Sequence, residues 1–463
     1  MDADDDLRRV PTATSNTSGS TAAVSRIFSA YTNPADTQST VILGAGIIGC
    51  ATAYYLAHSG NTRPDTIHLV EASEELFASA SGKAAGFLAE DWFGPATADL
   101  GALSFRLHRE LAEQHDGRRN WGYSRSTGMS YTTIATSLSA ESTGRQKMGK
   151  DFLSDNTSRA NTARPYESQS NERDPRDEWP VWLTQKPGDH LQRLTSTDTV
   201  AQIDPLRLCR WLLQACLRAG VRLHHPARAV RVSRDEQCNL SGVRLRYLAH
   251  GAEHKLPCTR LLVAAGAWTP GVFDELFPGS MVRIPVMPLA GHSLVMKSSR
   301  WEAKECHAIF TSETAERWSP EIFSRVGGEI YIAGLNDPEL PLPDTPDKAK
   351  ADSKAISKLR HVADSILANG SGVDDADSDV YTVREGLCFR PVTPTGNPVV
   401  ARVPKGMLGP GIETQDVPVG GVYVATGHGP WGISLALGTA KVLQEMMEGE
   451  RENESKEVKH LGF

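Results

Sequence analysis

Residues 41–71 read VILGAGIIGCATAYYLAHSGNTRPDTIHLVE, and this stretch decides how the rest of the chain is interpreted. It opens with a short β-branched apolar run, which is typical of a buried parallel strand. Gly44, Gly46 and Gly49 follow as G-x-G-x-x-G. The first glycine allows a tight turn, the second lets the backbone approach a pyrophosphate, and the third lets a helix pack on the strand.

The second half of this stretch completes the unit. Residues 48–58 have a helical pattern, and Gly60 is suited to cap its C-terminus. A second strand, residues 67–70, leads to Glu71, 22 residues after Gly49 (71 − 49). An acid at this point accepts hydrogen bonds from an adenosine ribose. Because the strand, the glycines, the helix, the second strand and the acid follow one another at the expected spacing, the sequence predicts a dinucleotide-binding unit rather than a chance Gly-rich turn.

Length and composition set outer bounds on the protein. Its 463 residues allow roughly two to four domains. A net charge of −7, with no basic patch among aromatic residues, gives no reason to expect nucleic-acid binding. No apolar run approaches the ~20 residues of a membrane span, and the acidic N-terminus resembles neither a secretory signal nor a transit peptide. Seven cysteines without a C-x-x-C spacing favour no disulfide framework and no metal site. We therefore expect a cytoplasmic protein.

Two polar segments cannot build a core. Residues 1–38 are rich in Ser, Thr, Ala and Asp, and we expect a disordered leader there. Residues 137–177 are crowded with Ser, Thr, Asn, Arg and Glu, which predicts a disordered insertion. This insertion is either a mobile segment or one that docks a partner.

Three small-residue stretches are candidates for close contact with a cofactor. Residues 79–86 follow the nucleotide unit, and Ser81 or Lys83 could reach phosphate oxygens there; the alternative is an ordinary Ser/Gly loop. Residues 261–270 form a buried strand that ends in a small-residue turn, or else a plain strand-to-helix connection. Residues 422–432 run from a strand into a Gly-rich turn before a helix, which presents N–H groups to an anion.

The remaining ordered stretches predict helices and a second sheet. Amphipathic helices are expected over residues 97–116 and 206–219. From residue 282 to about 379, strand-like stretches alternate with Pro-rich turns, and one helix, about residues 348–367, interrupts them. This texture predicts an antiparallel sheet in a domain that faces the first.

Taken together, these blocks resemble the family of FAD-dependent amine and amino-acid oxidases that includes D-amino-acid oxidase, glycine oxidase and sarcosine oxidase. The matching pieces are GAGIIG with Glu71, ASGKAAGF, AAGAWTP, RPVTPTGNP and ATGHGPWGI, in the family's order between residues 41 and 445. The resemblance does not cover the leader, the 137–177 insertion or the helix near 348–367.

The resemblance implies an α/β fold in which a discontinuous FAD-binding Rossmann-like domain of the glutathione-reductase type joins an antiparallel-sheet substrate domain. The FAD-binding domain would comprise residues 39–123, 195–275 and 385–450. The substrate domain would comprise residues 124–194 and 276–384, and residues 451–463 would form a tail.

The resemblance also implies the cofactor contacts. The three glycines would hold the FAD pyrophosphate, Glu71 the ribose and Val230 the adenine, through its backbone. The turn at residues 427–432 would place N–H groups at the flavin pyrimidine edge. The predicted FAD-binding residues are Gly44, Gly46, Ile47, Ile48, Gly49, Glu71, Ala72, Ser79, Ser81, Gly82, Lys83, Ala84, Ala85, Gly86, Val230, Ala265, Gly266, Trp268, Cys388, Gly427, His428, Gly429, Trp431, Gly432 and Ile433.

Four residues carry predictions about the reaction. Arg390 matches the arginine that binds the substrate carboxylate in glycine-oxidase-like members; the alternative is a structural arginine. Cys388 has the spacing of the cysteine that carries covalent flavin in sarcosine and fructosyl amino-acid oxidases. The alternative, which we favour, is a packed cysteine beside non-covalent FAD. His292 and His428 are candidate acids or bases, but amine oxidation can proceed without one, so both are assigned a positional role.

The predicted reaction takes a hydride from the C–N carbon of an amine or amino acid, with electrons passed to oxygen or another acceptor. Sarcosine oxidases keep a lysine where residues 288–292 read PLAGH, and this departure leaves the acceptor open. Two alternatives are a dehydrogenase of α-hydroxy acids and a flavin-binding protein that acts through partners. In the favoured interpretation the partner is a small-molecule substrate, and the oligomeric state is not predicted.

Overall fold

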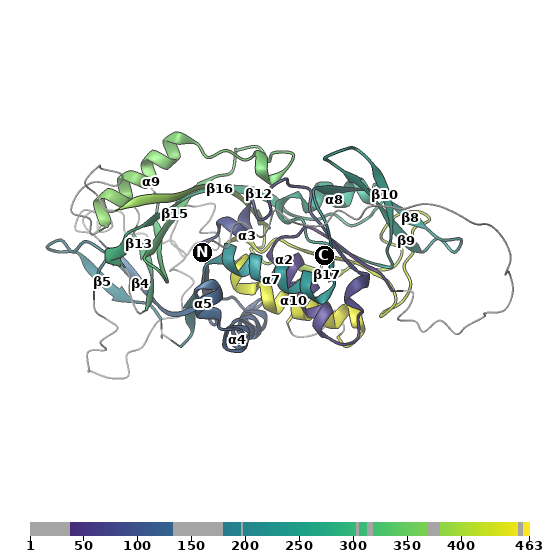
Figure 1. The fold of residues 1–463 in the computed structure, drawn as a ribbon, viewed down its shortest axis with the longest axis horizontal. Coiled ribbons are helices and arrows are strands. Elements are labelled where there is room, and N and C mark those ends of the chain that lie inside the picture. Colours follow the sequence, from purple (N-terminus) through teal and green to yellow (C-terminus); the bar gives the residue numbers. More distant parts are fainter. Residues whose placement is uncertain are drawn as a thin grey trace. The chain divides into compact units, whose positions relative to one another are not determined.

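The computed structural model describes residues 38–132, 179–195, 198–301, 305–312, 318–367, 380–451 and 457–463. The predicted leader, apart from Gln38, and the predicted insertion at 137–177 lie outside the described residues. The described part of the chain is an α/β structure built on three sheets (Figure 1).

A six-stranded sheet forms the nucleotide-binding side, in the order β17-β18-β11-β1-β2-β7. Neighbouring strands are parallel except for the antiparallel pair β17–β18. The strands are β1 (Thr40–Leu43), β2 (Ile67–Val70), β7 (Arg222–His224), β11 (Arg260–Val263), β17 (Val399–Arg402) and β18 (Gly421–Thr426). Because the carboxyl ends of parallel strands meet at one edge, the loops after β1, β2, β11 and β18 lie together.

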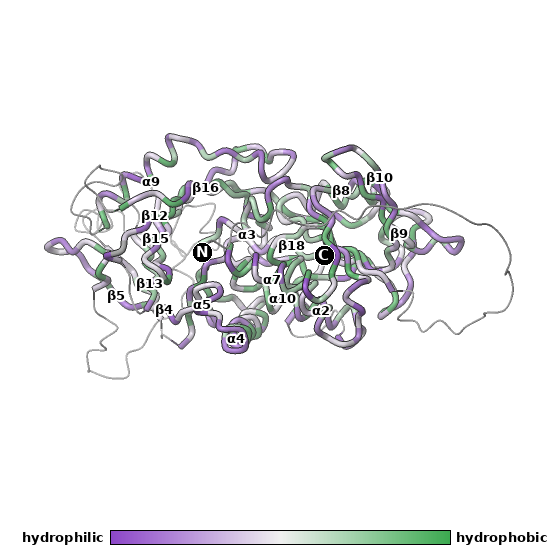
Figure 2. Tube along the Cα trace, in the orientation of Figure 1, coloured by the Kyte–Doolittle hydropathy of each residue, from purple (hydrophilic) through white to green (hydrophobic). Residues whose placement is uncertain are grey.

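Helices and a small sheet cover the two faces of this parallel sheet. The helices that share a core with one face are α2 (Ile47–His58), α4 (Ala98–Gln114), α7 (Pro205–Ala219) and α10 (Gly432–Glu448). The other face packs on α8 (Thr269–Leu276) and on an antiparallel sheet of β8 (Ala227–Arg234), β9 (Leu240–Tyr247) and β10 (Glu253–Pro257). Burial on both faces explains why residues 41–43 of β1 and 261–263 of β11 are all apolar. In Figure 2, hydrophobic (green) parts of the trace gather around the label of β18, which belongs to this sheet.

The largest sheet has nine strands in the order β16-β12-β15-β14-β13-β4-β6-β3, with β5 paired to β4. It is antiparallel, as the sequence predicts, except for one parallel pair, β4–β13. The strands are β3 (Phe87–Ala89), β4 (Ser124–Thr132), β5 (His190–Arg193), β6 (Val200–Gln202), β12 (Met287–Lys297), β13 (Cys306–Thr311), β14 (Glu321–Arg325), β15 (Glu329–Asp337) and β16 (Tyr381–Val392). Strands β3, β6 and most of β16 fall in ranges assigned to the FAD-binding domain, and the domain boundaries remain a prediction.

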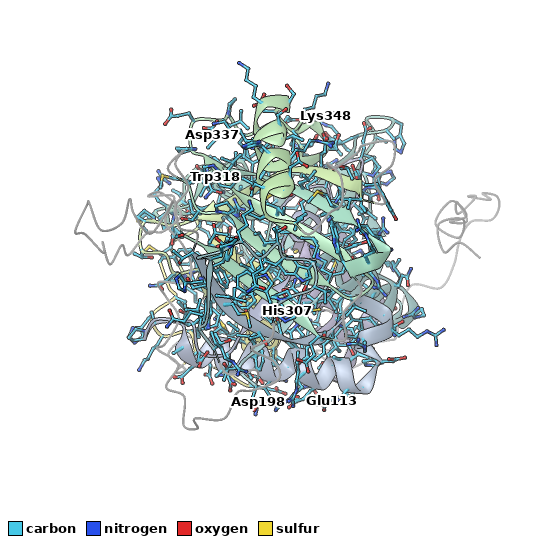
Figure 3. All side chains as sticks on the ribbon, turned by 90° about the vertical axis from the view of Figure 1, so that its left-hand side faces the viewer. Glu113, Asp198, His307, Trp318, Asp337 and Lys348 are labelled. Atoms are coloured by element: carbon cyan, nitrogen blue, oxygen red, sulfur yellow. The ribbon has the colours of Figure 1, made fainter. Side chains whose placement is uncertain are left out.

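The two faces of the nine-stranded sheet have different neighbours. Helix α9 (Ser353–Ile366) covers one face through Ile356 and Leu359, which share a core with Leu294, Trp318 and other residues of that face. Figure 3 shows the green helix in front of the sheet, with Trp318 labelled near it. We call this the outer face. The inner face contributes residues such as Tyr331 to the core built with α2, α4, α7 and α10. The sheet therefore presents its inner face to the nucleotide-binding side.

The helices expected over residues 97–116, 206–219 and about 348–367 are all present, as α4, α7 and α9. Helix α7 begins after Asp204, whose side chain accepts hydrogen bonds from the backbone N–H groups of Leu206 and Arg207. It ends at Gly220, which has a φ of 108°. The short helices are η2 (Pro64–Thr66), α3 (Ala80–Lys83), α5 (Gly117–Trp121), η5 (Gly266–Trp268), η6 (Ser299–Trp301), η7 (Pro346–Lys348) and η8 (Gly429–Trp431).

The chain end packs on the parallel sheet. Val458 and Leu461 are buried, and the N–H of Val400 in β17 donates to the carbonyl of Leu461 at 2.8 Å. Within the described residues, every helix is too short or too polar to cross a membrane.

Candidate active site

A cavity of about 430 Å³ lies against the carboxyl ends of the parallel strands and the inner face of the large sheet. Sequence-predicted residues line it from both sides. They are Gly44, Gly46, Ile47, Ile48, Glu71, Ala72, Ser79, Ser81, Ala84, Ala85, Gly86, Ala265, Gly266, Trp268, Cys388, Arg390, His428, Gly429, Gly432 and Ile433. Segments more than 380 residues apart in the sequence thus meet at one cavity.

The glycine loop forms one end of the cavity. Gly44 has a φ of +105°, and a Cβ there would lie 2.4 Å from the carbonyl oxygen of Ala264, so only glycine fits this turn. Helix α2 begins directly after Gly46, which has no side chain of its own to cap the helix N-terminus. The N–H of Ile47 donates to Ser81 Oγ at 3.0 Å. The positive end of α2 therefore faces the cavity, which suits an anion such as a pyrophosphate.

Glu71 is held by the backbone on both carboxylate oxygens. Its Oε2 accepts from the N–H of Ala45 at 3.0 Å, and its Oε1 accepts from the N–H of Ser73 at 2.9 Å. Burial raises the pKa of Glu71, and these hydrogen bonds act in the opposite direction. Because a carboxylate oxygen has two lone pairs, each oxygen can still accept from a ligand hydroxyl.

The connection between β15 and α9, residues 338–352, crosses to the nucleotide-binding side. Trp268 Nε1 donates to the carbonyl of Pro343 at 2.7 Å, and Arg228 Nη2 donates to both carboxylate oxygens of Asp344 at 2.8 Å. Ser73 Oγ donates to Asp347 at 3.0 Å. Arg228, Asp344 and Pro346 line the cavity. Sequence reasoning missed Arg228, Asp344 and Pro346. A Pro-rich run indicates turns, but it does not indicate which part of the protein those turns pack against.

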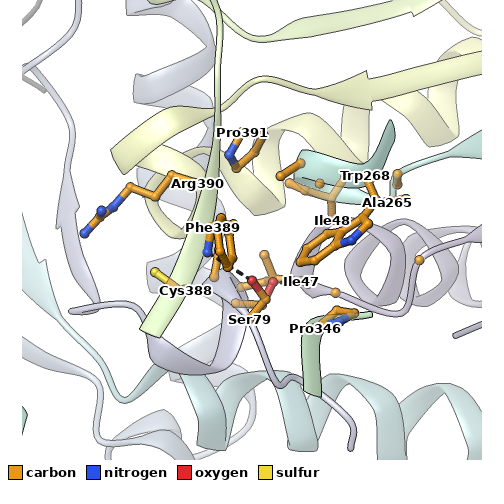
Figure 4. Close-up of a pocket in the computed structure, with 18 of the residues that line it drawn as sticks. Ile47, Ile48, Ser79, Ala265, Trp268, Pro346, Cys388, Phe389, Arg390 and Pro391 are labelled. Atoms are coloured by element: carbon orange, nitrogen blue, oxygen red, sulfur yellow. Dashed lines mark hydrogen bonds between the residues drawn. The ribbon is translucent and has the colours of Figure 1, made fainter. Parts of the chain in front are cut away.

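Arg390 enters the cavity from the inner face of the large sheet. Its guanidinium passes over Gly291 on β12, where a Cβ would lie 1.9 Å from Nη1. Among the described residues the guanidinium has one hydrogen-bond partner, Asn336 on β15, at 2.8 Å from Nη1. Nε and Nη2 remain as donors, which suits a carboxylate. Figure 4 shows Arg390 and Cys388 on the same side of β16.

Three further residues of this face line the cavity and were missed by sequence reasoning: Glu321, Tyr331 and Ala333. Burial by itself would lower the pKa of the Arg390 guanidinium, but Cys388, Tyr331 and Glu321 raise it, and the net pKa lies above its ordinary value. The strand alternation could have indicated which residues share a face. It could not have indicated which strands are neighbours.

The two histidines lie in different places. His428 lines the cavity, with Nε2 3.1 Å from Thr439 Oγ1, and burial lowers its pKa to about 4, so it is neutral at neutral pH. His292 lies on the outer face of β12, where Nε2 accepts from the N–H of Asp352 at 3.1 Å. Burial lowers the pKa of His292, although Asp352 acts to raise it. His292 is outside the cavity lining, because residues 291 and 292 point to opposite faces of the sheet.

Other residues predicted to bind FAD lie outside the cavity lining, and two of them, Gly49 and Lys83, have contacts within the protein instead. A Cβ on Gly49 would lie 2.0 Å from the Gly44 carbonyl, so Gly49 allows α2 to pack on β1. Lys83 Nζ donates to the carbonyl of Leu387 at 3.1 Å, which turns it towards β16 rather than towards the glycine loop. In β8, Ala227, Arg228 and Ala229 line the cavity instead of Val230. The predicted residues outside the lining are Gly49, Gly82, Lys83, Val230, His292, Gly427 and Trp431.

Comparison with known sequences gives a family match over most of the chain. Residues 39–446 match the family model DAO, described as FAD dependent oxidoreductase. A protein of Schizosaccharomyces pombe that carries the name of an oxidoreductase, with no stated substrate, is 26% identical over 89% of this chain and 94% of its own. The oxidoreductase-type protein TDA3 of Saccharomyces cerevisiae is 24% identical over 89% and 91%.

Comparison with solved structures gives similar folds. Glycine oxidase from Bacillus cereus matches with a TM-score of 0.59 and 17% identity, over 91% of this chain and 98% of its own. L-amino acid deaminase from Proteus vulgaris matches with a TM-score of 0.62 and 13% identity, over 92% and 96%. At these identities the likeness establishes the fold.

Proposed function

The chain belongs to the DAO family of FAD-dependent oxidoreductases, and from this premise we propose that it oxidises an amine or amino acid that carries a carboxylate. In this proposal a hydride leaves the carbon bound to nitrogen, and the electrons pass on to oxygen or another acceptor. The observation that carries the proposal is Arg390, whose guanidinium lies on the inner face of the large sheet. Two of its nitrogens have no hydrogen-bond partner within the part of the chain that the structure describes.

The residues of the cavity fit FAD. A small-residue loop leads into the N-terminus of α2, Glu71 offers its carboxylate, and a Cβ on Gly46 would lie 3.0 Å from Ser81 Oγ and narrow the loop. Gly44, Gly46 and Ile47 would hold the pyrophosphate, Glu71 the ribose, and Gly429 to Ile433 the flavin end. When bound, FAD supplies the hydride acceptor.

The chain's own residues bind and orient the substrate. Arg390 would hold the carboxylate in two charge-assisted hydrogen bonds, which fixes the α-carbon relative to the sheet. Tyr331 and Ala333 would close the cavity against water from the same face. His428, neutral and bonded to Thr439, would keep the turn at residues 427–432 in place rather than transfer a proton.

An anaerobic screen tests this proposal. Holo-protein is mixed with amines, with both enantiomers of the amino acids and with α-hydroxy acids, and loss of the oxidised flavin absorption is recorded. We expect carboxylated amines to bleach the flavin. Bleaching by α-hydroxy acids alone would favour a hydroxy-acid dehydrogenase. Absence of bleaching by every compound would favour a protein that acts through partners.

The flavin attachment gives a second test. Cys388 is buried and lines the cavity beside Arg390. Since free cysteines are most often small packed hydrophobic residues, we expect non-covalent FAD. Acid precipitation should release all flavin into the supernatant, and Cys388→Ser protein should keep its FAD. A yellow pellet from the wild type that Cys388→Ser loses would refute this expectation.

The cytoplasmic location expected from the sequence is part of the same proposal. Fractionation of cells that produce the full chain checks it, with the protein expected beside cytosolic markers.

A further inference from the structure

Glu321 belongs to the inner face of the large sheet together with Arg390. Glu321 on β14 pairs with Ala333 on β15, and Ala333 pairs with Ser293 on β12. Ser293 in turn pairs with Gly386 on β16, four residues before Arg390. Because directly paired residues share a face and alternate residues return to it, Glu321 and Arg390 project to the same side. Both line the cavity.

The two side chains also interact electrostatically. The Arg390 guanidinium crosses β12 to reach Asn336 on β15, the strand that neighbours β14. Its charged end therefore approaches the strand that carries Glu321. Glu321 is among the groups that raise the pKa of Arg390, which places the carboxylate within electrostatic range of the guanidinium. The cavity face thus presents a cation and an anion to the same ligand.

An anion at this point discriminates between substrate classes. A ligand with only a carboxylate gains from Arg390 but is repelled by Glu321. A ligand that also carries an ammonium group gains from both charges. The pair therefore suits a zwitterion better than a hydroxy acid, whose hydroxyl offers no positive charge.

We propose that Glu321 binds the cationic nitrogen of the substrate and thereby selects zwitterionic α-amino acids over α-hydroxy acids and simple carboxylates. The inference rests on the proposed function, since it assumes that Arg390 holds the substrate carboxylate. It goes beyond that function by naming the residue that binds the substrate ammonium group.

The test uses three ligands of nearly the same shape. They are 2-aminoisobutyrate, 2-hydroxyisobutyrate and pivalate, which carry an ammonium, a hydroxyl and a methyl group on the same carbon. Since that carbon bears no hydrogen, no hydride can leave it, and binding is measured without turnover. Dissociation constants are determined by calorimetric titration of FAD-loaded wild type, Glu321→Gln, Glu321→Asp and Glu385→Gln.

The wild type should bind 2-aminoisobutyrate more tightly than the other two ligands. Glu321→Gln should raise the dissociation constant of 2-aminoisobutyrate by about tenfold or more, as expected for loss of a charge-assisted pair. The dissociation constant of pivalate should stay unchanged or fall. Glu321→Asp, which keeps the charge, should recover part of the preference and shows whether the site is still folded. Glu385→Gln removes an outer-face carboxylate of β16 that is bonded to Arg360, and should leave all three constants unchanged.

Several results would overturn the inference. One is a wild type that binds pivalate as tightly as 2-aminoisobutyrate. Another is a Glu321→Gln protein in which all three ligands bind tighter by the same factor, because Glu321 would then only balance the charge of Arg390. Failure of the anaerobic screen with every amine would instead refute the proposed function, so the two failures are distinguishable.

Discussion

The Gly46→Leu protein is expected to purify colourless, with little or no FAD bound. Gly46 precedes α2 with a φ of −70° and a ψ of −176°, a conformation open to any residue, so the backbone can accommodate leucine. The added side chain would start 3.0 Å from Ser81 Oγ and fill the space in front of the helix N-terminus. An extra side chain in a packed site costs about 1–3 kcal/mol, and here it also blocks the approach to the N–H groups. The FAD-to-protein absorbance ratio and FAD titration of apo-protein measure the loss.

The matched control is Gly94→Leu. Gly94 is exposed, has no positive φ, and a Cβ there meets nothing within 4 Å. This protein should be as yellow as the wild type. A yellow Gly46→Leu protein with unchanged FAD affinity would show that the cofactor does not approach this glycine.

The Arg390→Ala protein is expected to lose affinity for carboxylated substrates and to keep its affinity for the corresponding amines without a carboxylate. Removing one partner of a buried charge pair costs about 2–5 kcal/mol, which corresponds to roughly 30-fold or more in KM. Arg390→Lys should recover only part of this, since an ammonium cannot offer two parallel donors. Anaerobic flavin reduction, measured over a range of substrate concentrations, separates binding from the rate at saturation.

Arg384→Ala is the control for Arg390. Arg384 lies six residues earlier on β16, on the same face, but does not line the cavity. Its replacement should lower the affinity for carboxylated substrates and for amines without a carboxylate only slightly, and by the same factor. If Arg390→Ala instead lowers affinity for the amine and the amino acid by the same factor, Arg390 does not hold the carboxylate.

The nucleotide-binding unit could be predicted because its signal is local. In residues 41–71 the strand, the turn glycines, the helix and the acid follow one another at fixed spacing, and the structure confirms strand β1, helix α2 and strand β2 there. The family and FAD as its cofactor are confirmed for a related reason. Each matching block is a short local turn, and only the order of the blocks along the chain had to be checked.

The substrate side could be predicted only in part, because it depends on register between distant strands. His292 was a candidate acid or base at the end of the stretch PLAGH, yet its side chain points to the outer face of β12, where it contacts Asp352 before α9. Glu321 gave no signal in the sequence, since its position opposite Ala333 follows from the pairing of β14 with β15. Asp344 reaches Arg228 only because the 338–352 connection crosses between two sheets. The roles of these residues stay predictions.

The strand order of the parallel sheet means that the two ends of the cavity are synthesised far apart in time. Strand β1 is made early, but its neighbour β11 lies beside β18, and the walls formed by β18 and α10 come last. Gly44 and Ile433, which line the same cavity, are 389 residues apart (433 − 44). At 5–20 residues per second, roughly 20–80 seconds pass between the synthesis of Gly44 and that of Ile433. A chain released before residue 432 lacks α10 altogether, so the cavity that would hold the flavin is complete only when nearly the whole chain has been made.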